Sequence, residues 1–83
     1  MSTGQLDARA RAYAALGDPS RLAIVDLLAR TDLSSGELGA RLDLPTNLMA
    51  HHLQVLELAG LITRRRSEGD GRRSYVRLTP ACH

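Results

Sequence analysis

The sequence predicts a mainly α-helical domain that ends in a small β-hairpin. Two observations support this prediction. Residues 33–62 hold two short stretches of helical periodicity separated by a proline-containing turn, and residues 62–78 hold two arginine-rich stretches with glycines between them. Two further helical stretches precede them in residues 5–29. The resulting order, α-α-α-α-β-β, is that of a winged helix-turn-helix, which we assign to residues 5–83 after a polar tail at residues 1–4.

The first two helices are predicted from apolar spacing and from the residues at their junction. Leu6 and Tyr13 lie on one face of a helix over residues 5–16, which Gly17 ends. Asp18 can accept hydrogen bonds from the free N–H groups of the next helix. Pro19 suits its first position, because the N–H that proline lacks would have no partner there. We expect the inner face of this second helix to consist of Leu22, Val25, Leu28 and Ala29.

The third and fourth helices form the predicted helix-turn-helix. Ser34 and Glu37 have the spacing of a capping box, which starts a helix of about two turns. Pro45 separates the two helices, because the residue before a proline is pushed out of the helical region. The fourth helix then occupies about residues 45–59 and ends at a C-cap glycine, Gly60. Its buried stripe is predicted to be Met49, Leu53, Leu56 and Gly60.

The opposite face of the fourth helix carries short polar or small side chains. They are Thr46, Asn47, Ala50, His51 and Gln54. In the major groove of DNA, the amides of Asn and Gln can pair with adenine, His can donate to guanine or phosphate, and Ala permits close approach. An ordinary solvent-exposed helix surface is the alternative interpretation. The neighbouring His52 falls at the edge of the buried stripe, and we expect it to be a partly buried structural residue.

The predicted hairpin lies in the basic half of the chain. Residues 44–83 hold six arginines and three acidic residues, a net charge of +3. A three-residue loop at residues 69–71 places Ile62 opposite Leu78 and keeps the apolar residues on one face, with Arg64 opposite Val76. Arginines near the loop can reach a phosphate or a narrow minor groove. These arginines are Arg66, Arg72 and Arg73. An ordinary solvated face would also carry such charge, but its position after the fourth helix favours DNA.

The composition argues against several other functions. With no Trp, no Phe and two Tyr, the chain lacks the aromatic residues on which single-stranded nucleic acid stacks. One cysteine, Cys82, cannot form an internal disulfide, and no apolar stretch is long enough to cross a membrane. His51 and His52 point about 100° apart on a helix and cannot share a metal ion. We find no catalytic set, cofactor motif, metal site or signal peptide, and therefore expect a cytoplasmic, non-enzymatic protein without a cofactor.

Several short motifs, in order along the chain, match those of one known protein family. They are LGDPSRL at residues 16–22, GEL at 36–38, HLQVLE at 52–57 with AGL at 59–61, and YVRL at 75–78. With these motifs the whole chain resembles the DNA-binding core of the ArsR/SmtB family of bacterial repressors.

This resemblance implies a transcriptional repressor. Residues 45–59 would enter the major groove of double-stranded operator DNA, and the wing at residues 62–78 would lie on the backbone or in the minor groove. It also implies a homodimer on a palindromic operator. Members of the family commonly sense metal ions, but where one recurrent site has cysteines, this sequence has Ser34, Gly36 and Gly39.

A narrower resemblance points to a larger protein. NLMAHHL at residues 47–53 resembles the branch of the family that is fused to a low-molecular-weight arsenate reductase, and thus a role in arsenic resistance. The chain also stops at His83, before the C-terminal dimerisation helix that is usual in the family. The second interpretation is therefore an N-terminal regulatory domain of a larger enzyme, with catalysis outside this chain. With the first helix alone at the interface, we expect a weak homodimer held largely by Leu6 and Tyr13.

Overall fold

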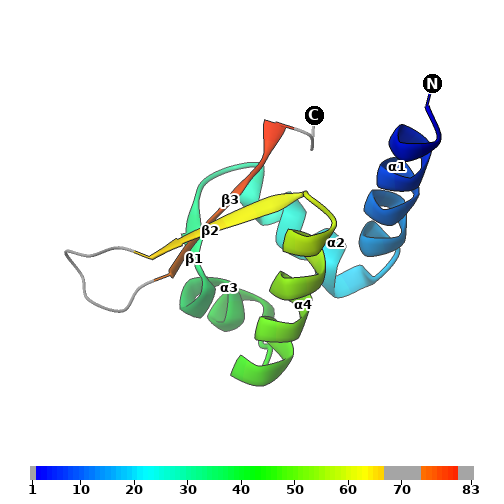
Figure 1. Ribbon diagram of the computed structural model, residues 1–83. Coiled ribbons are helices and arrows are strands. Elements are labelled where there is room, and N and C mark those ends of the chain that lie inside the picture. The colour runs from blue at the N-terminus through cyan, green and yellow to red at the C-terminus, as the bar shows by residue number, and fades with distance from the viewer. Residues whose placement is uncertain (1, 67–73, 81–83) are drawn as a thin grey trace.

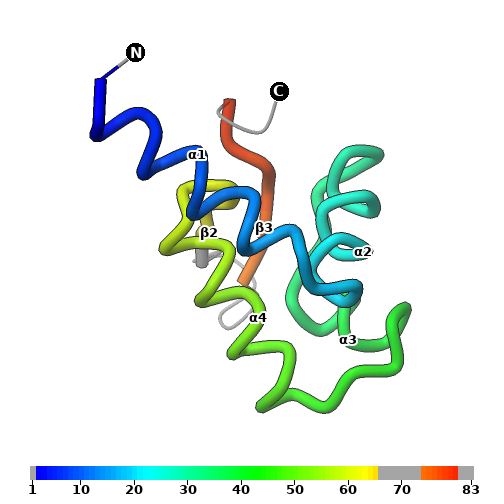
Figure 2. Tube along the Cα trace, turned by 90° about the vertical axis from the view of Figure 1, so that its right-hand side faces the viewer, coloured from blue at the N-terminus to red at the C-terminus, as the bar shows by residue number. Residues whose placement is uncertain are grey.

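The predicted succession of helices and hairpin is confirmed by the computed structural model, which describes residues 2–66 and 74–80. The elements are α1 (Thr3–Leu16), α2 (Pro19–Leu28), β1 (Leu33–Ser34), α3 (Ser35–Leu42), α4 (Thr46–Leu58), β2 (Ile62–Arg66) and β3 (Ser74–Leu78). Figure 1 shows α2, α3 and α4 grouped beside the strands, while α1 projects outward. In the turned view, α1 lies across the side formed by α2 and α4, the two helices it contacts (Figure 2). The short strand β1 was not predicted.

The first helix begins earlier than the sequence pattern predicts. Ser2 and Gln5 form a capping box: the Ser2 Oγ accepts from the Gln5 N–H at 3.2 Å, and the Ser2 N–H donates to Gln5 Oε1 at 3.0 Å. Because two free N–H groups gain partners in this way, the helix starts at Thr3. Residues 3 and 4 are thus helical, and the assignment of residues 1–4 to a polar tail is wrong for them.

The second helix begins as predicted. The Asp18 carboxylate accepts from the backbone N–H groups of Ser20 at 2.8 Å and Arg21 at 3.2 Å, and Pro19 occupies the first position. The hydrogen bond from the Arg21 N–H lowers the pKa of Asp18 below its ordinary value, with smaller contributions from the Ser20 N–H and the charge of Arg21.

The buried face of α2 differs from the prediction. Ile24 and Leu28 are buried, whereas Leu22 is 45% exposed and Ala29 is also exposed. The predicted inner face is therefore wrong at Leu22 and Ala29, and it omits Ile24. Val25 is partly buried and packs against the core. The cause is the sequence itself: α2 is apolar on almost every side, so its periodicity does not identify the face that the neighbouring helices cover.

The third and fourth helices have the predicted boundaries. Ser34 and Glu37 form the expected capping box, in which the Ser34 Oγ accepts from the Glu37 N–H at 3.1 Å and the Ser34 N–H donates to Glu37 Oε1 at 3.0 Å. Asp43, in the left-handed region at φ 54°, ends α3. Gly60, at φ 79°, and Leu61 donate to the last carbonyls of α4 as in a Schellman motif. Gly60 is the predicted terminator, but it is exposed and so not part of the buried stripe.

The strands form one antiparallel sheet in the order β1-β3-β2. Ile62 pairs with Leu78 and Arg64 with Val76, which confirms the predicted register of the wing. The predicted loop at residues 69–71 lies outside the described residues. The short strand β1 pairs with the other edge of β3, so β3 is the central strand.

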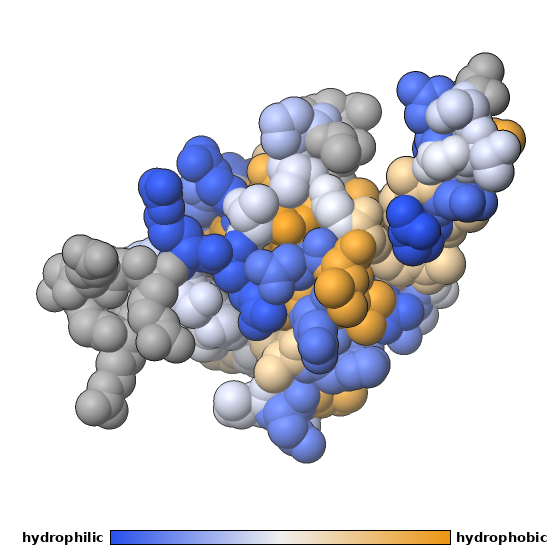
Figure 3. Space-filling view, viewed as in Figure 1, coloured by the Kyte–Doolittle hydropathy of each residue, from blue (hydrophilic) through white to orange (hydrophobic). Residues whose placement is uncertain are grey.

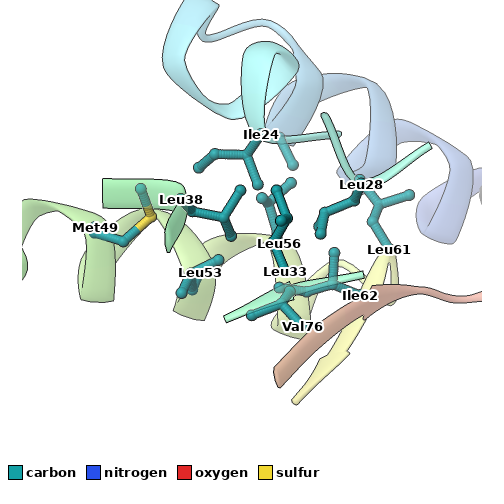
Figure 4. Close-up of a cluster of buried hydrophobic side chains, with 11 residues drawn as sticks. Ile24, Leu28, Leu33, Leu38, Met49, Leu53, Leu56, Leu61, Ile62 and Val76 are labelled. Atoms are coloured by element: carbon teal, nitrogen blue, oxygen red, sulfur yellow. The ribbon is translucent and has the colours of Figure 1, made fainter. Parts of the chain in front are cut away.

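The core lies between the helices and the sheet, and its apolar members are all aliphatic side chains or methionine. Figure 4 shows how side chains of α2, α3, α4 and the strands converge there. They include Met49, Leu53 and Leu56, the three residues with bulky side chains in the buried stripe predicted for α4. Because this stripe is locked into the core, the opposite face of α4 is held outward beside the wing.

Candidate nucleic-acid interface

The outward face of α4 is the first part of the candidate interface. All five predicted residues of this face are exposed, and we call them the polar stripe: Thr46, Asn47, Ala50, His51 and Gln54. The start of α4 projects from the body of the domain (Figure 1). Its N-cap, Pro45, makes no side-chain cap hydrogen bond. The first N–H groups of α4 therefore have no side-chain cap at the positive end of the helix dipole, where an anion is favoured.

His52 is separate from the polar stripe. Its side chain is 6% exposed, and its Nδ1 lies 3.2 Å from Arg21 Nη1, while Arg21 Nε donates to the carbonyl of Ala15 at 2.7 Å. Since a guanidinium can only donate, the His52 Nδ1 is the acceptor in this arrangement. Arg21 thus links α4 to the ends of α1 and α2. The expected structural role of His52 is confirmed.

A hollow between α3, α4 and the wing is the second part of the interface. It has a volume of about 500 Å³ and is open to solvent. α3 lines it with small residues, α4 with Thr46 and Ala50 of the polar stripe, and the strands with Arg64 and Ser74. The hollow therefore opens on the same side of the molecule as the polar stripe.

The wing supplies positive charge next to this hollow. Hydrophilic residues gather over the strands, as Figure 3 shows. Arg64, Arg65 and Arg77 are exposed there. Arg64 donates to Glu57 Oε1 through Nε at 3.2 Å and Nη2 at 2.8 Å, and Arg77 Nε lies 3.5 Å from Asp32 Oδ2. The predicted contacts Arg72 and Arg73, and the side chain of Arg66, lie outside the described residues.

Arg64 lines the hollow together with Thr46 and Ala50 of the polar stripe. It was not among the site residues predicted from the sequence. The prediction chose arginines by their distance from the loop in sequence. The register was the signal that could have identified Arg64, because pairing it with Val76 turns it to the face of the sheet that meets α3 and α4.

No group of three or more His, Cys, Asp or Glu side chains within residues 2–66 and 74–80 could hold a metal ion. No helix there is both long and apolar enough to span a membrane.

Comparisons with known proteins identify the family. A family model described as a helix-turn-helix domain matches residues 16–65, which is more than half of the chain. A protein of Synechocystis sp. named transcriptional repressor SmtB homolog is 35% identical over 78 residues, covering 94% of this chain and 57% of that protein. This chain belongs to the ArsR/SmtB family of transcriptional repressors. The chain spans a little over half the length of this Synechocystis relative.

Solved structures give the same fold for this member of the ArsR/SmtB family. HlyU from Vibrio cholerae superposes with a TM-score of 0.86 at 25% identity, covering 99% of this chain and 86% of that one. The homodimeric winged helix-turn-helix DNA-binding domain Mb0332 from Mycobacterium bovis superposes with a TM-score of 0.83 at 31% identity, covering 94% of this chain and 72% of that one. The winged helix-turn-helix predicted from the sequence is thus confirmed, and the regulator family to which the chain belongs is typically not enzymatic.

Proposed function

We propose that this repressor binds double-stranded operator DNA in a sequence-specific manner, with α4 in the major groove. The observation that carries the proposal is the polar stripe, which is exposed along α4 from Thr46 to Gln54 while Met49 and Leu53 behind it are buried. A helix locked into a core on one side and polar on the other can enter a groove without unfolding. Its free N-terminal N–H groups favour a phosphate beside that groove.

Each member of the polar stripe has a chemical role in this proposal. The amides of Asn47 and Gln54 pair with adenine through one donor and one acceptor, and His51 donates to guanine or to a phosphate. Ala50 lets the helix approach the bases and contacts a thymine methyl group. Thr46, at the first position of α4, contacts a phosphate through its hydroxyl.

The wing forms the second contact with DNA. Arg66, Arg72 and Arg73 are assigned to the phosphate backbone or the minor groove because they flank the predicted loop of a basic hairpin. The three acidic residues of the same half of the chain, Glu57, Glu68 and Asp70, limit its net positive charge. Phosphate contacts fix the register of the protein, whereas the polar stripe supplies the sequence preference.

The proposed active form is a homodimer on a palindromic operator. Leu6 and Tyr13 on α1 are 53% and 67% exposed, which leaves apolar surface available to a second copy. The relative Mb0332 is described as homodimeric, and a two-fold operator would strengthen a weak dimer by linkage. A fused arsenate reductase has no support in these comparisons and is not part of the proposal.

The test begins with selection of bound duplexes from a random pool, followed by titration of variants. Gln54→Ala and Asn47→Ala are each expected to weaken binding to the selected duplex by about 1 to 3 kcal/mol and to leave binding to random duplex nearly unchanged. Asp26→Ala, on the exposed surface of α2, is the control and should change neither. Equal losses on selected and random duplex would contradict the assignment of base contacts to the polar stripe.

A further inference from the structure

Arg64 occupies an unusual place for a charged residue. It lies in the middle of β2, between Ile62 and Arg66, and pairs with Val76 in β3. Ile62 and Val76 share its side of the sheet and are buried at 1% and 0% exposure, whereas the Arg64 side chain keeps 33% of its surface exposed. Its charged end therefore extends past the edge of the core and into the hollow.

The hydrogen bonds that Arg64 makes with described residues involve only part of its guanidinium. Nε and Nη2 both donate to the same oxygen of Glu57, at 3.2 and 2.8 Å. Nη1 has no hydrogen-bond acceptor among the described residues. Glu57 thus holds one side of the guanidinium in place, and the other nitrogen can still donate to an incoming acceptor.

The chemistry of the hollow fits an oxygen-rich anion. Three hydroxyl groups line it together with the guanidinium, those of Ser35, Thr46 and Ser74, and none of the described lining residues is acidic. Gly36 adds open space: a Cβ built there would meet only the Ser34 Oγ, at 3.9 Å, so internal packing does not require the glycine. Hydroxyl and guanidinium donors around an open space are the usual partners of a DNA phosphate.

We propose that this hollow receives one phosphate of the DNA strand that passes between α4 and the wing, and that Arg64, positioned by Glu57, neutralises it. The inference rests on the proposed DNA binding and adds a contact that the sequence did not identify. Thr46 and Ala50 join the two parts, because they belong to the polar stripe and also line the hollow. A strand flanking the groove occupied by α4 therefore passes over Arg64.

The main test is the salt dependence of DNA binding by Arg64→Gln. Loss of one phosphate contact should reduce the slope of log K against log salt by about 0.9 for each bound protomer, which is about eightfold in affinity at 0.1 M salt. The loss should be the same for selected and random duplex, since a phosphate carries no sequence information. Arg30→Gln, which removes the same charge from the exposed turn after α2, should change the slope far less.

A second variant separates this role from a structural one. Glu57→Gln also breaks the ion pair between α4 and β2 but keeps Arg64 and an oxygen that can accept from it. It should lower the salt slope and the affinity far less than Arg64→Gln does, because the amide oxygen still accepts from Arg64 and a negative charge near the phosphate is removed. Equal losses in Glu57→Gln and Arg64→Gln would show that Arg64 only ties β2 to α4, and would overturn the proposal. Melting curves check that both variants fold.

The phosphate itself can be located with modified DNA. Each phosphate of the selected duplex is replaced in turn by an uncharged methylphosphonate, and the affinity of wild type and variants is measured. One position in each half-site should weaken wild type and Arg30→Gln but have no further effect on Arg64→Gln. If every position weakens Arg64→Gln as much as wild type, the inference fails while DNA binding stands. If wild type binds no duplex in a salt-dependent manner, the proposed function fails first.

Discussion

Replacing Arg21 by methionine tests how the three helices around it are joined. The change keeps an unbranched apolar side chain but removes the donors to Ala15 O and His52 Nδ1. The carbonyl of Ala15 belongs to the last turn of α1, and the residue four positions on is Pro19, which has no N–H to offer. Arg21 therefore satisfies an acceptor that the helix cannot satisfy itself.

In Arg21→Met the acceptors Ala15 O and His52 Nδ1 both lose their donor, and this loss sets the expected decrease in the free energy of unfolding. Each partly buried acceptor without a donor costs about 1 kcal/mol, at the low end of the range for buried groups, so Arg21→Met should lose about 2 kcal/mol. A domain of this size loses about 4 to 8 °C of Tm per kcal/mol, which gives a decrease of about 8 to 16 °C.

Thermal and urea unfolding followed by circular dichroism measure this effect directly. Arg30→Met is the matched control, because Arg30 is exposed after the end of α2, and it should change the free energy of unfolding by less than about 0.5 kcal/mol. If Arg21→Met is as stable as this control, the hydrogen bonds of the Arg21 side chain do not stabilise the junction of the helices.

Three further predictions concern the core, the pH dependence and the assembly. Leu56→Ala, at a fully buried position, should lower the free energy of unfolding in urea by about 2 to 5 kcal/mol. Leu58→Ala, at a residue that is 76% exposed, should lower it by less than about 0.5 kcal/mol. Similar losses in the two variants would show that Leu56 is not part of the core. Because the folded-state pKa of Asp18 is lowered, its ionised form adds stability above the unfolded value of about 3.9, and this advantage over Asp18→Asn should disappear as the pH falls through the folded-state pKa. An advantage that persists in acid would contradict this assignment. Tyr13→Ala should shift the concentration-dependent dimer towards monomer in sedimentation, and an unchanged equilibrium would exclude α1 from the interface.

Local backbone chemistry was the most predictable part of this fold. The Asp18 cap, the Ser34 capping box and the terminator Gly60 all depend on residues within a few positions of one another, and all three were confirmed. The same rule applied to Ser2 and Gln5 would also have placed the start of α1 correctly.

Features decided by distant parts of the chain were less predictable. Ile24 rather than Leu22 is buried because α1, α3 and α4 cover that side of α2, and an almost wholly apolar helix carries no signal of this choice. β1 has only two residues and exists because β3 is beside it, so it shows no periodicity of its own. The candidate site was limited in the same way: the polar stripe follows from the period of one helix, whereas the place of Arg64 depends on three elements.

Ser34 belongs to two structural units at once. It is the last residue of β1, paired with Tyr75 of the central strand, and it is also the N-cap of α3. No linker separates β1 from α3 at this point, so the start of α3 is fixed to the central strand β3. If DNA binds as proposed, a strand that presses on the wing is therefore expected to change the angle at which α4 meets the bases.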